Sequence, residues 1–406
     1  MAKPNRQLRS HAGTRRKSAS AIDNRQLKRL VPLLLRWFAA NARDLPWRRT
    51  RDPYAIWVSE IMLQQTQVKT VLPYWNRWMR ALPTIQSVAK ASPDKIHKLW
   101  EGLGYYTRAR NLQKAARQIV ETHGGKFPRD FDDVLALSGI GRYTAGAICS
   151  IAFNQPVPIL DGNVIRVLAR IFGISENPRE KETNARLWKL AGELVTTAGK
   201  PPFFRSSRRK EAPSSKSEIS QSLLTSAATC SYLNQSLMEL GALVCTPRKP
   251  QCRMCPVKRL CLAFRENRVE ELPNLSKRSP ATHRHFVAFI AEWNGRFLVR
   301  QRPVGVVNAH LWEFPDTEIL NGKFHAKLAA KKIWGAELTR IEPFCTLKHS
   351  ITRYRITLEA FHVRLKKAPR RVDGVWRTPA QMDRLAFTAA HKKLAGFAAH
   401  RILSGR

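Results

Sequence analysis

Apolar residues recur at helical spacing over most of residues 27–200, with polar residues between them. The spacing predicts helices over 67–81, 107–122, 143–152, 163–171 and 183–197. Another helix is expected after Asp52 and Pro53, because aspartate caps a helix start and proline suits the first position. Glycine-containing turns at 102–104 and 139–141 separate some of these segments. This part of the chain is therefore predicted to be mainly α-helical.

Two stretches interrupt the helical pattern. Residues 200–231 are rich in Ser, Lys and Arg, which predicts a flexible surface insertion before helical spacing resumes over 234–244. Residues 266–284 contain Pro273 and Pro280 and are interpreted as a linker. The first folded region is accordingly predicted to cover residues 28–265.

Residues 285–406 have a different pattern. The runs 285–293 and 296–302 are strand-like, and the Asn294-Gly295 pair between them is a strong hairpin signal. A third strand is expected within 351–365, and a helix over 379–403. The pattern predicts a separate α+β domain.

The chain is strongly basic. Its 406 residues include 71 Lys and Arg against 30 Asp and Glu, which gives a formal net charge of +41. Such an excess predicts a polyanionic partner, with nucleic acid ahead of an anionic membrane. No apolar run approaches the roughly 20 residues that span a bilayer, so no membrane segment is expected. Residues 1–27 form a basic tail, which could be solvated, bind DNA non-specifically or serve as a transit peptide.

Four of the seven cysteines lie within residues 245–261. Four thiolates can hold a 4Fe–4S cluster or tetrahedral zinc. Zinc sites usually bring two short cysteine pairs separated by a longer loop, whereas one compact loop suits a cubane cluster. The spacing therefore favours iron–sulfur in a reducing compartment, with the ligands Cys245, Cys252, Cys255 and Cys261.

Two glycine turns are candidates for contacts with DNA. Gly139 and Gly141 lie between two helical segments, where backbone amides at a helix start can bind a phosphate; a plain turn is the alternative. The turn at 102–104 is followed by two tyrosines at 105–106. These aromatic rings, with the glutamines at 64–65, suit insertion into a base stack, although core packing would also explain the tyrosines.

Two carboxylates suggest a reaction. Asp161 lies between a strand-like run and a helix, and Glu60 lies on a predicted helix. Taken singly, Asp161 could be a helix cap and Glu60 an ordinary helix residue. Together they fit glycosidic-bond cleavage, in which one acid protonates the leaving group and the other stabilises an oxocarbenium-like centre.

The ordered motifs of the chain resemble the MutY family of adenine DNA glycosylases, within the helix–hairpin–helix superfamily. The matching stretches are LPWR at 45–48, SEIMLQQTQV at 59–68, GLGYYTRARNL at 102–112, LSGIGRYTAGAI at 137–148, ILDGNVIRVLAR at 159–170 and NQSLMELGALVCTP at 234–247. The resemblance covers about residues 30–265 apart from 200–231, and it continues more weakly over 283–400. It implies removal of adenine mispaired with 8-oxoguanine or guanine in double-stranded DNA, after base flipping.

The resemblance also implies residue roles. Glu60 matches the general acid and Asp161 the carboxylate beside the sugar cation, with Tyr143 and Asn163 supporting these acids. The positions around the flipped adenine are Trp47, Arg48 and Gln235. The positions that contact the DNA or its 8-oxoguanine are Gln65, Thr66, Val68, Leu103, Tyr105, Gly139 and Gly141. A monomer with a 4Fe–4S cluster is expected, in the cytoplasm and at the nucleoid in a bacterial cell.

Two other functions remain as alternatives. Endonuclease III is similar in its fold, cluster and aspartate, but it carries a nucleophilic lysine in the hairpin where this chain has Tyr143. That tyrosine predicts a glycosylase without strong lyase activity. A DNA-binding protein that has lost catalysis is disfavoured by the presence of Glu60 and Asp161.

The last domain resembles the Nudix-like domain of the same family, which reads 8-oxoguanine. The hairpin and the motifs at 300–303 and 312–315 carry this resemblance. The following stretch offers only three carboxylates for a metal, so recognition without pyrophosphohydrolase chemistry is expected: Asp316, Glu318 and Glu337. The family's Phe-Ser-His turn aligns with residues 351–353, where Thr352 keeps a hydroxyl for 8-oxoguanine and Arg353 replaces the histidine.

Overall fold

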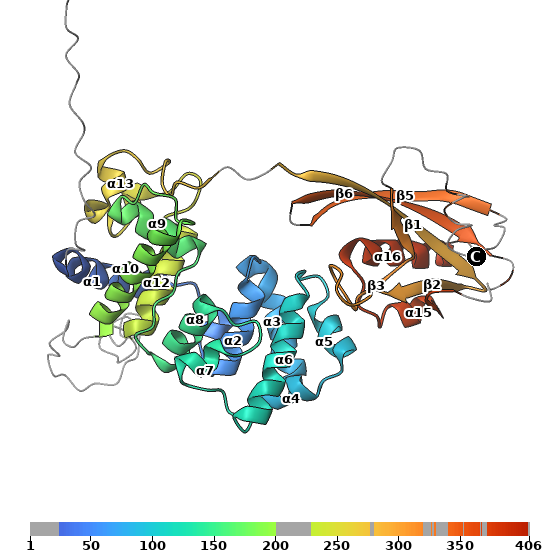
Figure 1. Ribbon diagram of the computed structural model, residues 1–406, viewed down its shortest axis with the longest axis horizontal. Coiled ribbons are helices and arrows are strands. Elements are labelled where there is room, and N and C mark those ends of the chain that lie inside the picture. Colours follow the sequence, from blue (N-terminus) through green and yellow to red (C-terminus); the bar gives the residue numbers. More distant parts are fainter. Residues whose placement is uncertain are drawn as a thin grey trace, which may run out of the picture. The chain divides into compact units, whose positions relative to one another are not determined.

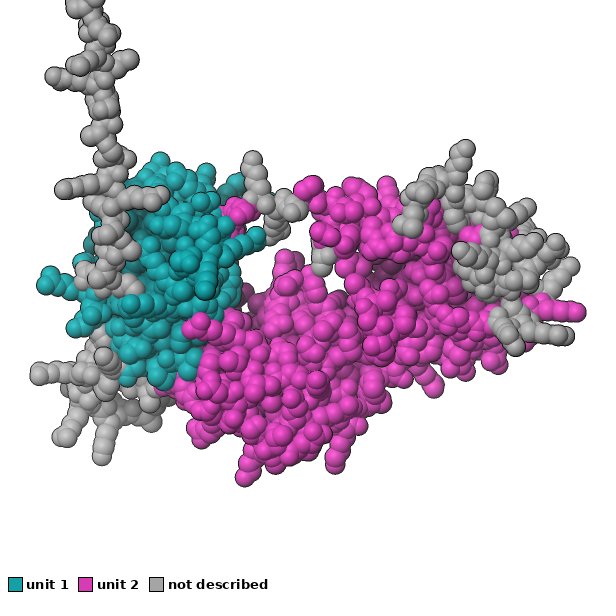
Figure 2. Space-filling model, viewed as in Figure 1, with its two compact units in different colours: residues 1–42, 156–274 teal, residues 43–155, 275–406 magenta. Residues whose placement is uncertain are grey.

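The computed structural model describes residues 24–199, 229–276, 280–319, 326, 329, 340–351, 353–365, 367 and 372–404. The chain divides into two compact units (Figure 2): residues 1–42 with 156–274, and residues 43–155 with 275–406. The helical region that the sequence presents as one is thus shared between both units. No helix in the described part of the chain combines the length and hydropathy that a bilayer crossing requires.

The first unit is a helical bundle whose last segment carries the cysteine loop (Figure 1). Helix α12 packs against the other three long helices of the bundle. Leu30 and Leu34 of α1 and Leu237 of α12 are among the buried residues of this unit. The elements are α1 (Asn24–Asn41), α9 (Gly162–Phe172), α10 (Lys181–Gly199), α12 (Thr229–Leu243), η2 (Cys252–Met254), η3 (Lys258–Leu260) and α13 (Leu262–Arg265).

Two expected boundaries in this unit are wrong. Helix α1 begins at Asn24, so the last four residues of the expected basic tail belong to this helix, and Leu27 is fully buried in the core. Helix α12 begins at Thr229, five residues before the expected start, because Cys230 and Ser231 are also buried. The rest of the tail, 1–23, and the rest of the insertion, 200–228, lie outside the described residues.

The second unit opens with a helical region built around α2, whose residues from Tyr54 to Met62 are all buried. The amide of Tyr54 donates to Asp52 Oδ1 at 3.0 Å, which confirms the expected cap. The elements are η1 (Pro46–Arg48), α2 (Pro53–Leu63), α3 (Val68–Ala81), α4 (Ile85–Lys90), α5 (Pro93–Trp100), α6 (Thr107–Thr122), α7 (Phe131–Leu135) and α8 (Arg142–Phe153). The short helices α4, α5 and α7 were not expected, although Thr84, Ser92 and Asp130 cap them.

The C-terminal part of the second unit is a seven-stranded sheet with helices beside it (Figure 1). Its order is β3-β2-β1-β6-β5, with β4 paired to β1 and β7 to β2. The expected hairpin is confirmed, because β1 and β2 pair antiparallel across Asn294 and Gly295, both at positive φ. The strands are β1 (Thr282–Trp293), β2 (Arg296–Gln301), β3 (Trp312–Glu313), β4 (Asp316–Glu318), β5 (Arg340–Ile351), β6 (Tyr354–Arg364) and β7 (Val375–Arg377).

Three expectations for the C-terminal half need correction. The strand expected over 351–365 corresponds to β6, whereas β5 was missed. The helix expected over 379–403 is two helices, α15 (Pro379–Met382) and α16 (Ala389–Ser404), because the chain between them forms a bridge from Phe387 to Trp312. The expected linker is partly fixed, since Leu272 is buried and its carbonyl accepts a bond from Arg170 Nε at 2.8 Å.

Candidate active site

Glu60 lies in the second unit, on the buried helix α2, and is only 6% exposed. The hydroxyl of Tyr143, on α8, donates to Glu60 Oε2 at 3.0 Å. The two helices pack against each other, so the contact joins elements far apart in the sequence. A buried carboxyl group held by a hydroxyl can exchange a proton with a group that enters the site.

Of the three residues expected around the adenine, Trp47 and Gln235 are buried and Arg48 is partly exposed. In the second unit Trp47 is 6% exposed and packs edge-on against Trp75, with ring centroids 5.8 Å apart. Arg48 Nη1 donates to the carbonyl of Arg43 at 3.1 Å. In the first unit Gln235 is buried on α12 and donates through Nε2 to Ser231 Oγ at 3.1 Å.

Asp161 lies in the first unit and caps helix α9. Its Oδ1 accepts the amide of Val164 at 2.8 Å, and its Oδ2 accepts Asn163 Nδ2 at 2.9 Å. Burial raises the pKa of the Asp161 carboxyl above its ordinary value, although these hydrogen bonds and the charge of Arg166 oppose the shift. Asp161 therefore serves two purposes, a helix cap and a fixed carboxyl group.

Arg166 joins this carboxyl group to the cysteine loop. Its Nη2 donates to Asn163 Oδ1 at 2.8 Å and to the carbonyl of Gly241 at 2.7 Å, while its Nε donates to the carbonyl of Cys245 at 2.6 Å. A β-carbon on Gly241 would lie 2.6 Å from that of Asn163, so only glycine allows this close approach of α12 to α9. A continuous chain of hydrogen bonds thus runs from the cysteine loop to Asp161.

The four cysteines of the expected cluster line one pocket together with apolar residues of α9 and α12. Arg170 Nη1 donates to Cys245 Sγ at 3.4 Å. Burial raises the pKa of the Cys255 thiol to about 12, so a thiolate there needs a metal to stabilise its charge. The donor set fits a metal centre bound by four thiolates.

The structure separates the two tyrosines that follow the 102–104 turn. Tyr105 is 44% exposed, whereas Tyr106 is buried and its hydroxyl accepts the amide of Gly102 at 3.2 Å. Gln65 is also exposed, but Leu103 is buried. Core packing therefore explains Tyr106, whereas Tyr105 and Gln65 both present their side chains to solvent. Thr66 and Val68 are partly exposed beside Gln65.

The hairpin glycines lie exposed immediately before helix α8. Gly139 has a φ of +77°, and a β-carbon there would lie 2.5 Å from that of Asn111. Gly141 is the N-cap residue of α8, with open space around it. Its exposed position leaves the amides at the start of this helix accessible to a phosphate.

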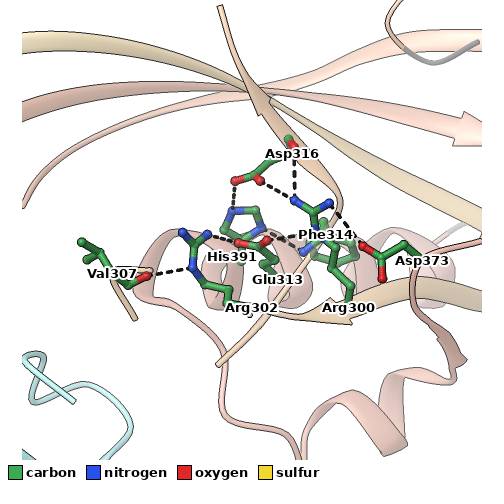
Figure 3. Close-up of polar contacts among 8 residues, drawn as sticks. All are labelled: Arg300, Arg302, Val307, Glu313, Phe314, Asp316, Asp373 and His391. Atoms are coloured by element: carbon green, nitrogen blue, oxygen red, sulfur yellow. Dashed lines mark hydrogen bonds and ion pairs between the residues drawn. The ribbon is translucent and has the colours of Figure 1, made fainter. Parts of the chain in front are cut away.

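Charged side chains in the C-terminal part form a buried network (Figure 3). Glu313 is 1% exposed and forms ion pairs with Arg300, at 3.0 Å, and with Arg302. Asp316 contacts Arg300 at 3.0 Å and His391 at 3.4 Å.

Ligand atoms of Glu313, Asp316 and His391 lie close enough together to hold a cation, but each of these residues already has a partner. His391 Nδ1 accepts the amide of Phe314 at 3.0 Å, and two guanidinium groups neutralise the carboxylates. Although burial alone would raise the pKa of Asp316, the contacts with His391, Arg300 and Arg302 outweigh it and lower that pKa. The network therefore joins β2, β3, β4 and α16 as a structural element.

Two expected residues of this domain lie outside the described part of the chain, namely Thr352 and Glu337. Glu318 forms an ion pair with Arg284, so, like Asp316, it already has a positively charged partner. Arg353 lies at the turn between β5 and β6, and its Nη2 donates to the hydroxyl of Tyr354 at 3.2 Å. Of the three carboxylates expected near a metal, the two that the structure describes, Asp316 and Glu318, both form ion pairs with arginines.

The sequence of this chain is similar to known protein families. Residues 58–193 match the HhH-GPD superfamily of base excision DNA repair proteins, and residues 286–396 match the NUDIX domain. Adenine DNA glycosylase from Mus musculus is 33% identical, over 89% of this chain and 76% of the mouse protein. The chain belongs to the adenine DNA glycosylase family.

A bacterial relative and a solved structure are also similar to this chain. Adenine DNA glycosylase from Buchnera aphidicola is 36% identical, over 71% of this chain and 75% of its own length. A solved thermostable thymine-DNA glycosylase covers 60% of this chain and 98% of its own, with a TM-score of 0.49 and 28% identity. In this adenine DNA glycosylase family member, the fold consists of a helical glycosylase region and a C-terminal Nudix-like domain.

Proposed function

We propose that this protein is a monofunctional DNA glycosylase that flips out and removes adenine opposite 8-oxoguanine or guanine in double-stranded DNA. The observation that carries the proposal is the buried carboxyl group of Glu60 with the Tyr143 hydroxyl at 3.0 Å, in a chain of this family. A net charge of +41 supports DNA as the partner.

The proposed reaction uses the two carboxyl groups in turn. Glu60 donates a proton to adenine, the C–N glycosidic bond breaks, and its electron pair leaves with the base. The positive charge that develops at C1′ is stabilised by the Asp161 carboxylate. A water then attacks C1′ and transfers its proton to Glu60, which restores the starting protonation state. Tyr143 and Asn163 support these groups through their hydrogen bonds.

The absence of strand cleavage follows from Tyr143. A lyase needs an amine that attacks C1′ and forms a Schiff base. A phenol hydroxyl bonded to Glu60 cannot form one. Borohydride should therefore trap no covalent adduct with a DNA substrate, and efficient trapping would refute the monofunctional assignment.

Recognition of the mispair is assigned to the exposed loops of the second unit. Gln65 and Tyr105 would enter the base stack at the 8-oxoguanine, with Thr66, Val68 and Leu103 close to that base. Trp47, Arg48 and Gln235 would surround the flipped adenine. The hairpin glycines Gly139 and Gly141 would bind a phosphate, and Thr352 of the C-terminal domain would contact 8-oxoguanine.

The metal centre is proposed to be a 4Fe–4S cluster held by the four cysteines. When bound, the cluster supplies iron–thiolate bonds that close the loop and fix its fold. Arg166 would then hold Asn163 and Asp161 against an ordered cysteine loop. The role assigned to the cluster is structural. We further propose a monomer that acts where DNA lies, in the cytoplasm and at the nucleoid of a bacterial cell.

The test uses an end-labelled duplex with one adenine opposite 8-oxoguanine. Strand breaks that occur only after alkali treatment indicate base removal without lyase action, which is the expected result. Breaks without alkali would indicate a bifunctional enzyme. Tight binding without breaks would contradict the assignment of activity. Affinity should also fall steeply with salt, because phosphate contacts release counterions.

A further inference from the structure

Two loops of the second unit each carry an exposed side chain at a backbone conformation that residues other than glycine rarely adopt. φ is +57° at Gln65 and +48° at Tyr105. Left-handed backbone at a residue other than glycine is unfavourable by itself. Contacts elsewhere must therefore hold both loops in this conformation.

Arg108 lies between these loops. It stands on α6, three residues after Tyr105, and is 9% exposed although arginine is among the most exposed residue types. Its Nη1 donates to three carbonyl oxygens at the end of α2 and just beyond it. These belong to Ile61, Met62 and Gln64, at 3.0, 2.9 and 2.6 Å.

The second terminal nitrogen of Arg108 reaches the other loop. Nη2 donates to the carbonyl oxygens of Leu103 and Gly104 at 3.1 Å each, and to Thr66 Oγ1 at 3.3 Å. The guanidinium carbon also lies 5.3 Å from the ring centroid of Tyr105. One planar group therefore bonds the residues on both sides of Gln65 and the two residues that precede Tyr105.

We propose that Arg108 is a positioning residue that locks Gln65 and Tyr105 into one relative arrangement, so that both enter the duplex together at a mispair. The inference rests on the proposed function. Both loops are ordered before DNA binds, which lowers the entropy lost on specific binding. Lysine cannot replace this group, because a single ammonium lacks the planar fork that addresses two loops at once. Preference for the mispair, rather than overall DNA affinity, depends on Arg108.

The first experiment compares binding by the full-length parent and Arg108→Lys. The two duplexes are undamaged DNA and DNA with 8-oxoguanine opposite a 2′-fluoro-adenine nucleotide that resists cleavage. The variant is expected to lose about tenfold in its preference for the mispair, a coupling typical of residues in contact. Affinity for undamaged DNA stays within about twofold of the parent. An unchanged preference would overturn the proposal.

The matched control is Arg117→Lys on the same helix. Arg117 is exposed and donates through Nε to the carbonyl of Ala89 at 3.2 Å, away from both loops. It should leave the mispair preference unchanged. An equal loss in both variants would indicate an effect of helix α6 as a whole and would contradict a specific role for Arg108.

A double-mutant cycle separates positioning from a general structural effect. In a background with Gln65→Ala and Tyr105→Ala, the residues through which Arg108 acts are gone. Arg108→Lys should then change the mispair preference by less than about twofold. The same tenfold loss in both backgrounds would show that Arg108 acts elsewhere, and the proposal would fail.

Amide hydrogen exchange in the free protein tests the lock without any DNA. The amides of Thr66 and Leu103 donate to the carbonyls of Leu63 and Trp100, at 3.1 and 3.0 Å. Both amides should exchange faster in Arg108→Lys. Faster exchange in one loop only, or in neither, would refute the proposal that Arg108 holds the two loops together. A parent that shows no mispair preference would refute the proposed function and leave this exchange result to decide the role of Arg108.

A second variant covers the case in which Arg108→Lys does not fold. Thr66→Val removes the hydroxyl that accepts Arg108 Nη2 and leaves the guanidinium in place. Although Thr66 lies in one loop, this substitution should also make the amide of Leu103 in the other loop exchange faster. Unchanged exchange at Leu103 would count against a link between the loops.

Discussion

Glu60 and Asp161 are both carboxylic acids, but their surroundings in the two units differ. Glu60 lies within a helix that is buried on all sides, and a tyrosine hydroxyl is one of its partners. Asp161 lies at the very start of a helix and accepts bonds from a backbone amide and from Asn163. Asn163 is itself held by Arg166, which also contacts the cysteine loop.

The difference suggests how the work is divided between the two acids. A group that transfers a proton must accept and donate it within one reaction cycle, and a hydroxyl partner permits both states. A group that stabilises a cation must stay ionised and fixed, and donors to the charged form favour this state. Glu60 fits the first description. Asp161 fits the second through its donors, which oppose the rise in pKa that burial causes. The predictions below test this division, from the largest expected effect to the smallest.

The largest effect is expected for Glu60→Gln. The amide keeps the shape of the side chain but cannot donate a proton to adenine, so base release should fall by about 10³-fold, within the range of general acid catalysis. Single-turnover base release and duplex binding measure the two quantities separately, and binding should persist. Glu121→Gln, at an exposed position of α6, is the control. Turnover of Glu60→Gln at the parent rate would remove Glu60 from the mechanism.

Asp161→Asn should lower base release by about 10²-fold, because it removes the charge that stabilises the sugar cation. Asparagine is as good an N-cap as aspartate, so helix α9 should stay folded. Circular dichroism and thermal unfolding check the fold, and single-turnover kinetics give the rate. A loss of rate that comes only with a loss of helix would mean that Asp161 is a cap and nothing more.

Tyr143→Phe removes the hydroxyl bonded to Glu60 Oε2. Base release should fall by about tenfold, in line with the loss of one hydrogen bond that positions the Glu60 carboxyl group. The same assay serves as the measurement. Tyr74→Phe is a matched control, because the Tyr74 hydroxyl donates to the backbone carbonyl of Glu101 at 3.0 Å. An equal effect in both variants would contradict a specific role for Tyr143.

The smallest effect is a shift in pH dependence for Asn163→Ala. Burial raises the pKa of Asp161, and the bond from Asn163 opposes that shift by favouring the charged form. Its loss should raise the pKa further, so the acid limb of the pH–rate profile moves to higher pH while the plateau changes less. Single-turnover rates across the acid range give the profile. A limb that stays in place or moves to lower pH would contradict the account.

Long amphipathic helices were predicted well from the sequence, and short or mixed elements were not. Helix α6 matches its expected range of 107–122, because its apolar residues keep a regular spacing over four turns. Strand β5 was missed because its sequence includes Pro343 and scattered charges, which hide the alternation. The break between α15 and α16 depends on the bridge from Phe387 to Trp312, a tertiary contact that no local pattern reveals.

The candidate site also has a part that the sequence predicts and a part that depends on tertiary packing. Chemical type and spacing identified Glu60, Asp161 and the four cysteines as candidates. The bond between Glu60 and Tyr143 joins residues 83 positions apart, so it depends on how α2 and α8 pack. Arg108 was missed because an Arg-Ala-Arg sequence looks like an exposed helix face, although the fold buries the first arginine and leaves Arg110 partly exposed.

The most direct test of the division between the two acids changes the leaving group. N7-methyladenine already carries a positive charge and departs as a neutral base, so it needs no proton from the enzyme. With this base opposite 8-oxoguanine, and after subtraction of spontaneous release, Glu60→Gln should recover to within about tenfold of the parent. Asp161→Asn should remain about 10²-fold slower, because the sugar cation still needs its charge. Equal recovery of both variants, or of neither, would contradict the assigned roles.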